Sequence, residues 1–329
     1  MRAARLQAPG RFTLVEEPDP VAGPGSSLVR VTAVGLCGSD LHWYAEGGIG
    51  DAQLDRPLVL GHEIAGVVAV GPRAGQRVAV DPALPCGRCE ICLEGHRNLC
   101  PHVRFAGHSD TDGGLRELLA WPDSHLHPLP DSVGDAAGAV LEPLGVAVHA
   151  MDLGHVRLAG SVAVIGCGPI GLLLVQAARA AGATTVVAVE PLAHRRVAAA
   201  RCGADLVVGP DDPDLASAGA DVVFEVVGSE PAVGLAVRAA RPGGRVVLVG
   251  IPDDDRTAFP GAAARRKGLT LAVVRRMKDV YPRALRLVER GVIDVDALVT
   301  HRYPLDEVDA AFRSAAAREG LKTVVQPAG

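Results

Sequence analysis

The pattern of apolar and polar positions changes near residue 135. From Ser27 to Val34 and from Ile64 to Val80, short β-branched runs alternate with Gly and Pro, which is typical of strands joined by turns. We therefore expect the first 130 residues to be rich in strands. From about Asp135, Ala-rich helical patterns alternate with the Val-rich runs SVAVIG, TTVVAVE, ADLVVG, ADVVFEVVG and GGRVVLVG. This alternation predicts βαβ units and a parallel sheet, hence an α/β fold.

The last sixty residues continue this pattern. After Thr270 the chain predicts a strand over LTLAVV, a helix from Val280 to Arg290 and an amphipathic helix from Leu305. A length of 329 residues exceeds what a single core usually supports, so we expect two domains.

Composition excludes several classes of protein. Hydrophobic residues make up 48% and charged residues 22%, close to the averages of globular proteins. The formal charge of -5 leaves no basic surplus for nucleic acid or anionic lipid. The first residues lack an apolar segment, and the apolar stretch from Val162 to Ala178 is interrupted by Gly and Pro. We therefore expect a cytoplasmic protein without a membrane span.

Four of the seven cysteines gather within fifteen residues. Their spacing is C-x2-C-x2-C-x7-C, formed by Cys86, Cys89, Cys92 and Cys100, which lets four thiolates surround one ion. A closed shell of protein ligands predicts a structural zinc, because no position is left for substrate. An iron–sulfur cluster and free thiols are the alternatives, although the bacterial cluster pattern ends with a shorter spacing.

A second set of ligand types is dispersed along the chain. It consists of Cys37 in GLCGSDLH, His62 and Glu63 in LGHE, and Glu142 in LEPLG. Each alone has an ordinary explanation as a packed or solvated side chain. Together they supply the sulfur, nitrogen and oxygen ligands of a catalytic zinc with one open position. Zinc there would favour loss of the proton of a bound alcohol, and Ser39 and His42, two and five residues after Cys37, could carry that proton outward.

The segment SVAVIGCGPIGLLLVQAARAAG predicts a nucleotide site. Gly166, Gly168 and Gly171 form G-x-G-x-x-G between a strand and a helix, where glycines let the backbone approach a pyrophosphate at the helix N-terminus. Glu190 ends the next strand, 24 residues after Gly166. An acid there binds both ribose hydroxyls and repels a 2′-phosphate, which favours NAD. Arg195 and Arg196 leave NADP open, because either could receive a phosphate.

These residues, in this order, resemble the zinc-dependent medium-chain dehydrogenase/reductase family, especially its sorbitol and polyol dehydrogenase branch. The resemblance covers essentially the whole chain. Its most specific pieces are CGSDLHWY at 37–44, GIGD at 48–51, RPLVLGHE at 56–63, CGRCEICLEGHRNLCP at 86–101, LEPLGVAVHA at 141–150 and GCGPIG at 166–171.

The resemblance implies a fold and a set of site residues. Residues 1–148 and 272–329 would form a GroES-like catalytic domain, and 149–271 a Rossmann NAD-binding domain, with the active site in the cleft. Cys37, His62 and Glu63 would hold the catalytic zinc, with Glu142 contacting the metal or its water. Ser39 and His42 would form the proton relay. Contacts to NAD would come from Ile170, Glu190 and Arg195, with Val249, Gly250 and Ile251 lining the nicotinamide.

The substrate end departs from the polyol pattern. Polyol members commonly carry an Arg-Tyr pair where this chain has Arg276 and Met277, which makes a cyclic or amino-substituted polyol plausible beside simple sugar alcohols. Tyr44 and Arg276 are the candidate substrate residues. The chain is also shorter than typical members around 209–220 and 252–260, which could alter the cleft or the oligomer surface.

These signals predict a zinc-dependent oxidoreductase that transfers a hydride from a secondary alcohol of a polyol-like substrate to NAD. We expect two zinc ions per chain and a homodimer or homotetramer. An L-threonine 3-dehydrogenase-like enzyme is the nearest alternative, because it uses a similar metal and relay set. A catalytically idle protein of the same fold is the alternative from another class, but it would have no reason to keep all of these ligands. The exact substrate is a matter of pocket shape, which motifs do not give.

Overall fold

The computed structural model describes residues 1–212, 219–252 and 256–328. The chain folds into two compact units. The first comprises Met1–Glu142, Tyr281–Arg290 and Val295–Gly329, and the second comprises Pro143–Val280 and Gly291–Asp294. The domain boundaries expected at 148 and 272 stay a prediction. The expected trimmed regions fall partly on 213–218 and 253–255, which lie outside the described residues.

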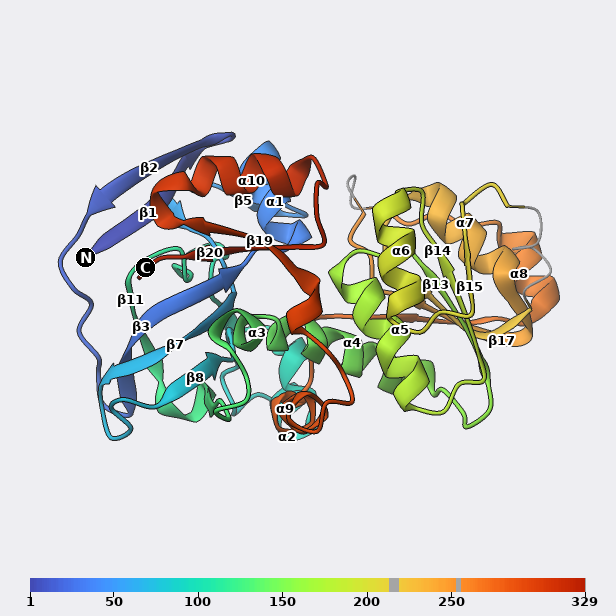
Figure 1. Ribbon diagram of the computed structural model, residues 1–329, viewed down its shortest axis with the longest axis horizontal. Coiled ribbons are helices and arrows are strands. Elements are labelled where there is room, and N and C mark those ends of the chain that lie inside the picture. Colours follow the sequence, from blue (N-terminus) through green and yellow to red (C-terminus); the bar gives the residue numbers. More distant parts are fainter. Residues whose placement is uncertain (213–218, 253–255, 329) are drawn as a thin grey trace. The chain divides into compact units, whose positions relative to one another are not determined.

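The first unit is rich in strands, which confirms the expectation for the first 130 residues (Figure 1). Its strands are β1 (Arg2–Ala8), β2 (Arg11–Glu16), β3 (Ser26–Gly35), β4 (Gly48–Ile49), β5 (Ala52–Gln53), β6 (Leu58–Val59), β7 (Glu63–Val70), β8 (Arg77–Val80), β9 (Ala83–Leu84), β10 (Arg104–Phe105), β11 (Leu118–Pro122), β12 (Leu126–Pro128), β19 (Val299–Pro304) and β20 (Lys322–Gln326). Its helices are α1 (Gly38–Glu46), α2 (Glu90–Leu93), α3 (Asp135–Ala139), α9 (Tyr281–Glu289) and α10 (Val308–Ala316), with 3₁₀ turns η1 (Arg97–Leu99), η2 (Asp123–His125), η4 (Asp296–Leu298) and η5 (Leu305–Glu307). Helix α4 (Leu141–Gly154) runs from the first unit into the second.

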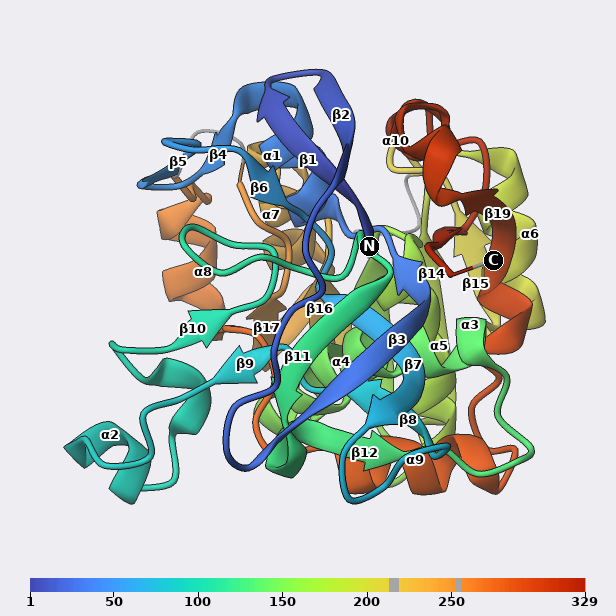
Figure 2. The same ribbon diagram turned by 90° about the vertical axis from the view of Figure 1, so that its left-hand side faces the viewer.

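The main sheet of the first unit brings distant segments together. Its strand order is β12-β8-β7-β3-β20-β19, and β11 also pairs with β3. Figure 2 shows β11, β3, β7 and β8 side by side. The C-terminal strand β20 pairs antiparallel with the end of β3, where Val324 and Val325 oppose Gly35 and Val34. The sequence analysis anticipated α9 and α10 but not β19 and β20.

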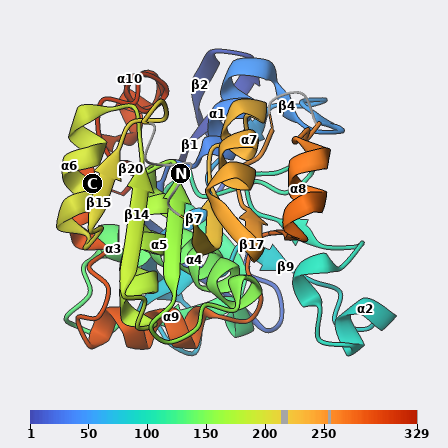
Figure 3. The ribbon, with the colours of Figure 1, turned by 90° about the vertical axis from the view of Figure 1, so that its right-hand side faces the viewer.

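The second unit is a parallel sheet with helices, as the alternating pattern predicted. Its strands are β13 (Ser161–Ile165), β14 (Thr185–Val189), β15 (Leu206–Val208), β16 (Ala220–Glu225), β17 (Ala240–Leu248) and β18 (Thr270–Val273), and its helices are α5 (Pro169–Ala180), α6 (Ala193–Arg201), α7 (Glu230–Ala239) and α8 (Gly261–Lys267). The strand order is β15-β14-β13-β16-β17-β18. All pairs are parallel, but successive strands are added in one direction from β13 to β15 and in the opposite direction from β16 to β18. Figure 1 shows α5 and α6 on one side of β13 and β14 and α8 on the other, and Figure 3 shows α6 and α8 toward opposite edges of the same sheet. This is the doubly wound arrangement, in which ligands bind beyond the carboxyl ends of the strands at the reversal.

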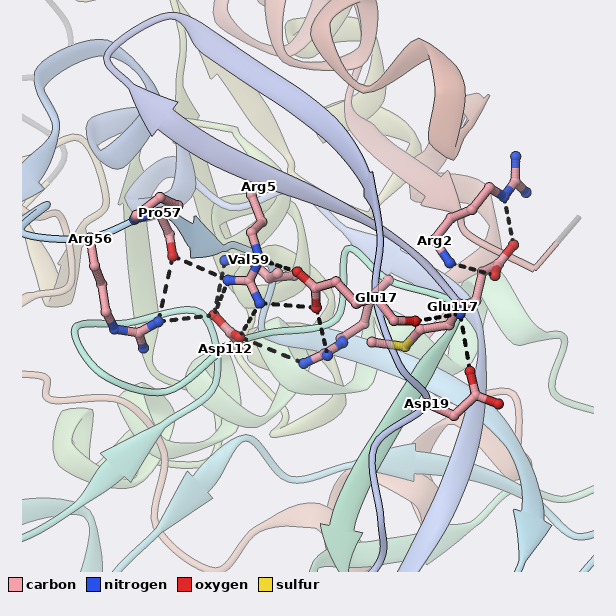
Figure 4. A network of polar contacts seen from close by, with 11 residues as sticks. Arg2, Arg5, Glu17, Asp19, Arg56, Pro57, Val59, Asp112 and Glu117 are labelled. Atoms are coloured by element: carbon pink, nitrogen blue, oxygen red, sulfur yellow. Dashed lines mark hydrogen bonds and ion pairs between the residues drawn. The ribbon is translucent and has the colours of Figure 1, made fainter.

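Charged side chains fasten the N-terminal hairpin to the rest of the first unit (Figure 4). Arg5 on β1 bonds to Glu17 and donates to Asp112 Oδ2 at 2.9 Å. Asp112 Oδ1 also accepts the backbone N–H of Val59 at 3.1 Å, while Arg2 donates to Glu117 Oε1 at 2.7 Å. The half-buried carboxylates and the hydrogen bonds raise the pKa of Arg5 above its ordinary value. A network of this kind stabilises more than isolated surface pairs do.

Among the described residues, no helix is both long and apolar enough to cross a bilayer.

Candidate metal centres and nucleotide site

Four cysteines from the segment 86–100 lie around a common point. One sulfur from each of Cys86, Cys89, Cys92 and Cys100 lies within 4.8 Å of all the others. The sulfurs of Cys89 and Cys100 are 3.9 Å apart, near the roughly 3.8 Å edge of a tetrahedron with zinc–sulfur bonds of about 2.3 Å. Turn glycines make this possible, since Gly87 and Gly95 have φ of 71° and 84°. The donor set therefore fits one zinc with no open position.

The thiols of this group differ in their surroundings. Backbone N–H groups of Arg88 and Cys89 lower the pKa of Cys86 to about 6, whereas burial raises the pKa of Cys92 to about 12. A thiolate is the form that binds zinc, so thiols of this group that are still protonated lose their protons to the solvent when zinc binds.

A second group combines three ligand types from two elements. Atoms of Cys37, His62 and Glu63 all lie within 4.8 Å of one another. Cys37 is the N-cap of α1, two residues after the end of β3, while Glu63 begins β7, which pairs with β3, and His62 immediately precedes it. Register opposes Glu63 to Gly35, and a Cβ on Gly35 would overlap Glu63 Oε2. The glycine therefore leaves room for the carboxylate beside the thiol.

The three side chains suit a divalent ion. Glu63 is fully buried, and its Oε2 has no hydrogen-bond partner among the described residues. A buried carboxylate oxygen in that state is costly unless something binds it. Thiolate, imidazole and carboxylate are the donor set of catalytic zinc sites with three protein ligands. The residues present thus fit a zinc ion.

Asp40 supports this group and was not singled out from the sequence. It is buried on α1, its Oδ2 accepts the backbone N–H of Cys37 at 2.9 Å, and its Oδ1 lies 3.4 Å from His62 Nδ1. Burial opposes charge on His62, but Asp40 outweighs it and raises the pKa of His62 well above its ordinary value. Burial likewise opposes charge on Asp40, yet His62 lowers the pKa of Asp40 overall. A carboxylate that holds one imidazole nitrogen orients the other toward a metal.

Glu142 is near the group but not within it. It is buried at the start of α4, and burial raises its pKa to about 7 while His62 and Lys322 act in the opposite direction. It is not among the residues whose donor atoms cluster within 4.8 Å. Its contact with the metal therefore stays a prediction.

The predicted relay residues lie on α1. Ser39 and His42 are both partly buried there, and His42 Nδ1 lies 3.3 Å from Glu46 Oε1 one turn later. Tyr44, a candidate substrate residue, packs instead in an aromatic cluster, with ring centroids 5.6 Å from Phe12 and 5.0 Å from Phe312. Its role toward substrate and the relay itself stay predictions.

The glycine loop has the geometry that its sequence predicts. Gly166 has φ of 94° and follows β13, and Gly168 precedes α5 with Pro169 at the first helical position. A Cβ on Gly171 would overlap the carbonyl oxygen of Gly166, so the third glycine is required for the helix to approach the strand. A helix N-terminus such as that of α5 carries partial positive charge and N–H groups without partners inside the helix, which suits a pyrophosphate.

Glu190 is more constrained than the sequence suggested. It is 4% exposed; its Oε2 accepts the N–H of Cys167 at 2.8 Å and its Oε1 accepts the N–H of Leu192 at 3.0 Å. Arg196 Nη1 donates to the carbonyl oxygens of Glu190 and Pro191 at 3.0 and 2.6 Å. Arg195 faces the loop, with Nη1 3.7 Å from where a Cβ on Gly168 would lie.

A second acid organises the neighbouring strand ends. The carbonyl oxygen of Glu225 accepts the N–H groups of Val249 and Gly250 at 2.8 and 3.1 Å, and its Oε1 accepts those of Val227 and Gly228 at 2.7 and 2.8 Å. Residues 249–251, expected to line the nicotinamide, are thus fixed beyond β17. Arg276, the other candidate substrate residue, has φ of 54°, and Met277 beside it is buried.

Comparisons with known proteins agree with this reading. Residues 23–131 match the family described as alcohol dehydrogenase GroES-like domain, and residues 169–290 match that described as zinc-binding dehydrogenase. The chain is 32% identical to sorbitol dehydrogenase of Bacillus subtilis, covering 99% of this chain and 97% of that protein. It is 35% identical to sorbitol dehydrogenase of Rattus norvegicus, covering 98% and 94%. A zinc-binding dehydrogenase structure from Sinorhizobium meliloti 1021, solved with NADP, has 33% identity and a TM-score of 0.90, covering 99% of each chain.

Proposed function

Because this chain belongs to the zinc-dependent medium-chain alcohol dehydrogenase family, we propose that it oxidises a secondary alcohol of a polyol-like substrate and transfers the hydride to NAD. The family membership already makes it a zinc-dependent dehydrogenase that acts on CH–OH groups and uses a nicotinamide cofactor. The observation that carries the proposal is the cluster of Cys37, His62 and Glu63. In this cluster the buried Oε2 of Glu63 has no hydrogen-bond partner among the described residues.

In this proposal the two cysteine-containing groups hold two zinc ions. Cys86, Cys89, Cys92 and Cys100 hold the structural ion, and Cys37, His62 and Glu63 hold the catalytic one, with Glu142 nearby. Zinc at the second group supplies the positive charge that lowers the pKa of a bound alcohol. Asp40 fixes His62 for this task. Ser39 and His42 carry the released proton, and Glu46 Oε1 lies 3.3 Å from His42 Nδ1.

The preference for NAD rests on Glu190. Two backbone N–H groups fix the carboxylate at the end of β14, and its remaining lone pairs can accept the ribose hydroxyls. A 2′-phosphate would meet a negative charge that cannot move aside. Arg195, whose Nη1 lies 3.7 Å from the position of a Cβ on Gly168, faces the glycine loop and could offset this repulsion. We expect NAD to exceed NADP in kcat/KM by roughly one to three powers of ten, each being about 1.4 kcal/mol.

A substrate and cofactor panel tests the proposal. NADH formation is followed by absorbance with sugar alcohols, inositols, aminocyclitols, threonine and simple alcohols, and the Cys37→Ala variant serves as the inactive control. Turnover of polyols or cyclitols supports the proposal, and turnover of threonine alone replaces it with the threonine dehydrogenase alternative. Inactivity of a fully zinc-loaded protein with every alcohol would favour the idle protein.

Glu190→Ala provides the matched test of cofactor choice. The variant should lose most of the preference for NAD, and adding Pro191→Arg should move it further toward NADP. Because Glu190 also holds the amide of Cys167, the affinity for NAD itself should fall as well. A wild-type protein that prefers NADP, or an unaltered preference in Glu190→Ala, would contradict this assignment.

A further inference from the structure

A buried lysine lies beside the candidate catalytic metal group. Lys322, at the start of β20, is 2% exposed, and its Nζ donates to Glu63 Oε1 at 2.6 Å. The same ammonium donates to the carbonyl oxygen of Leu36 at 2.9 Å, one residue before Cys37. A single cation is thus bonded to both chain segments that carry the three clustered ligands, although 259 residues separate it from Glu63.

The two oxygens of Glu63 are in different states. Oε1 is bonded to Lys322, whereas Oε2 is buried and has no partner among the described residues. Lys322 therefore leaves one oxygen for a metal and prevents the carboxylate from using both. Burying a lysine and a glutamate carries a desolvation penalty for each ion, which their attraction offsets only with good geometry. The pair is hard to explain as a device for stability alone.

We propose that Lys322 is a positioning residue that acts as the counter-ion of Glu63 in the metal-free protein and restrains it to one oxygen in the zinc-loaded protein. The inference rests on the proposed catalytic zinc site. His62 Nδ1 lies 3.4 Å from Asp40 Oδ1, so the positive charge that His62 can carry is directed to Asp40. Without zinc, Lys322 is therefore the cation bonded directly to Glu63.

This assignment has a thermodynamic consequence for metal binding. Removing the charge of Lys322 leaves Glu63 uncompensated in the metal-free form, while a bound zinc still compensates it in the loaded form. The substitution thus raises the free energy of the metal-free form more than that of the loaded form. By linkage, the variant must bind zinc more tightly than the wild type. A lysine that served only to pack β20 would give equal or weaker zinc binding.

The experiment compares Lys322→Met, which keeps the length of the side chain, with Lys322→Arg, which keeps its charge. Full-length protein that retains zinc in the four-cysteine site is titrated with zinc against a chelator at one fixed pH. Unfolding midpoints are measured with and without the second zinc. We expect Lys322→Met to bind the second zinc at least tenfold more tightly and to show a larger zinc-induced rise in the midpoint. Lys322→Arg should stay within about threefold of the wild type.

A third variant tests whether the effect passes through Glu63. In a Glu63→Gln background there is no carboxylate charge to compensate, so Lys322→Met should no longer tighten zinc binding. The double variant Glu63→Gln/Lys322→Met leaves no charge at either position, so it can still be measured if Lys322→Met alone fails to fold. Unchanged or weaker zinc binding in Lys322→Met, or an effect that persists with Glu63→Gln, overturns the inference. A wild-type protein that binds only one zinc and oxidises no alcohol would instead overturn the proposed function.

Discussion

The two cysteine-containing groups differ in almost every respect that matters for a metal. The four-cysteine group takes identical ligands from residues 86–100, and its geometry depends on local turns. The group around Cys37 takes three different ligands from α1 and β7, and two buried charged residues, Asp40 and Lys322, bond to its members or to their backbone. A closed set of thiolates suits an ion that stays, whereas mixed ligands with adjustable neighbours suit an ion that exchanges its fourth partner.

The charged neighbours show what each arrangement requires. At Cys86, backbone N–H groups lower the pKa of the thiol. Such a ligand needs no charged side chain beside it, only the local conformation of the chain. A carboxylate ligand must instead be desolvated, and its charge has to be compensated when no metal is bound. Hence the mixed group depends on the tertiary pairing of β3 with both β7 and β20, and the four-cysteine group does not.

The largest expected effect concerns the ligands of the mixed group. Cys37→Ala or His62→Ala should remove one of two zinc ions and lower kcat by at least about three powers of ten, because metal polarisation contributes several kcal/mol to alcohol activation. The unfolding midpoint should fall less than on loss of zinc from the four-cysteine group. Elemental analysis and steady-state kinetics measure both quantities. Two zinc ions retained in these variants would show that the catalytic ligands have been misassigned.

The opposite outcome is expected at the four-cysteine group. Cys92→Ser should lower the free energy of unfolding by several kcal/mol, because metal binding at a closed site contributes to folding. Thermal unfolding should shift down by about 10 °C, given about 2–4 °C for each kcal/mol in a domain of this size. Activity measured well below the midpoint should persist. Unchanged melting with lost turnover would reverse the roles of the two groups.

A smaller effect is expected one step away from the metal. Asp40→Asn keeps the shape of the side chain but removes the charge that holds His62 Nδ1, and zinc affinity of the mixed group should fall by about 10- to 100-fold. Chelator competition measures this affinity. Zinc in the four-cysteine group serves as the internal control, because Asp40 instead contacts Cys37, Gly61 and His62. Equal weakening of both ions would indicate general unfolding rather than loss of orientation.

Local pattern predicted much of this structure, and its failures have a physical cause. The parallel strands β13 to β18, the glycine loop and the four-cysteine group all follow from spacing within short segments. Strand β20 was missed because its five residues form a strand only when paired with β3, far away in sequence. Lys322 was missed for the same reason, since an isolated lysine is normally solvated and only this pairing buries it. Asp40 did leave a signal, because it is the third residue of α1 and its side chain accepts the N–H of Cys37, as acids at helix starts do.

The smallest effect is a loss of stability at acid pH that comes from His127 and does not involve zinc. It must be subtracted before acid destabilisation is attributed to zinc loss from the two metal groups. His127 on β12 stacks on Tyr281 with ring centroids 4.4 Å apart, and Tyr281 donates its hydroxyl to the carbonyl oxygen of Val80 at 2.8 Å. Burial, with help from His125 and Arg73, lowers the pKa of His127 from 6.5 to about 4. The folded protein therefore keeps His127 neutral where the unfolded chain takes up a proton. The stability that this contributes is complete above pH 6.5 and is lost progressively as the pH falls from 6.5 to 4.

After allowance for the partial exposure of the ring, we expect a loss of about 1 kcal/mol at pH 5. His127→Phe keeps the stacking and removes the titration, so its free energy of unfolding by urea should fall less than that of the wild type between pH 7 and pH 5. Any acid destabilisation that remains in this variant, and that added zinc reverses, then belongs to the metal groups. Parallel losses in the wild type and His127→Phe would show that His127 does not titrate in this way.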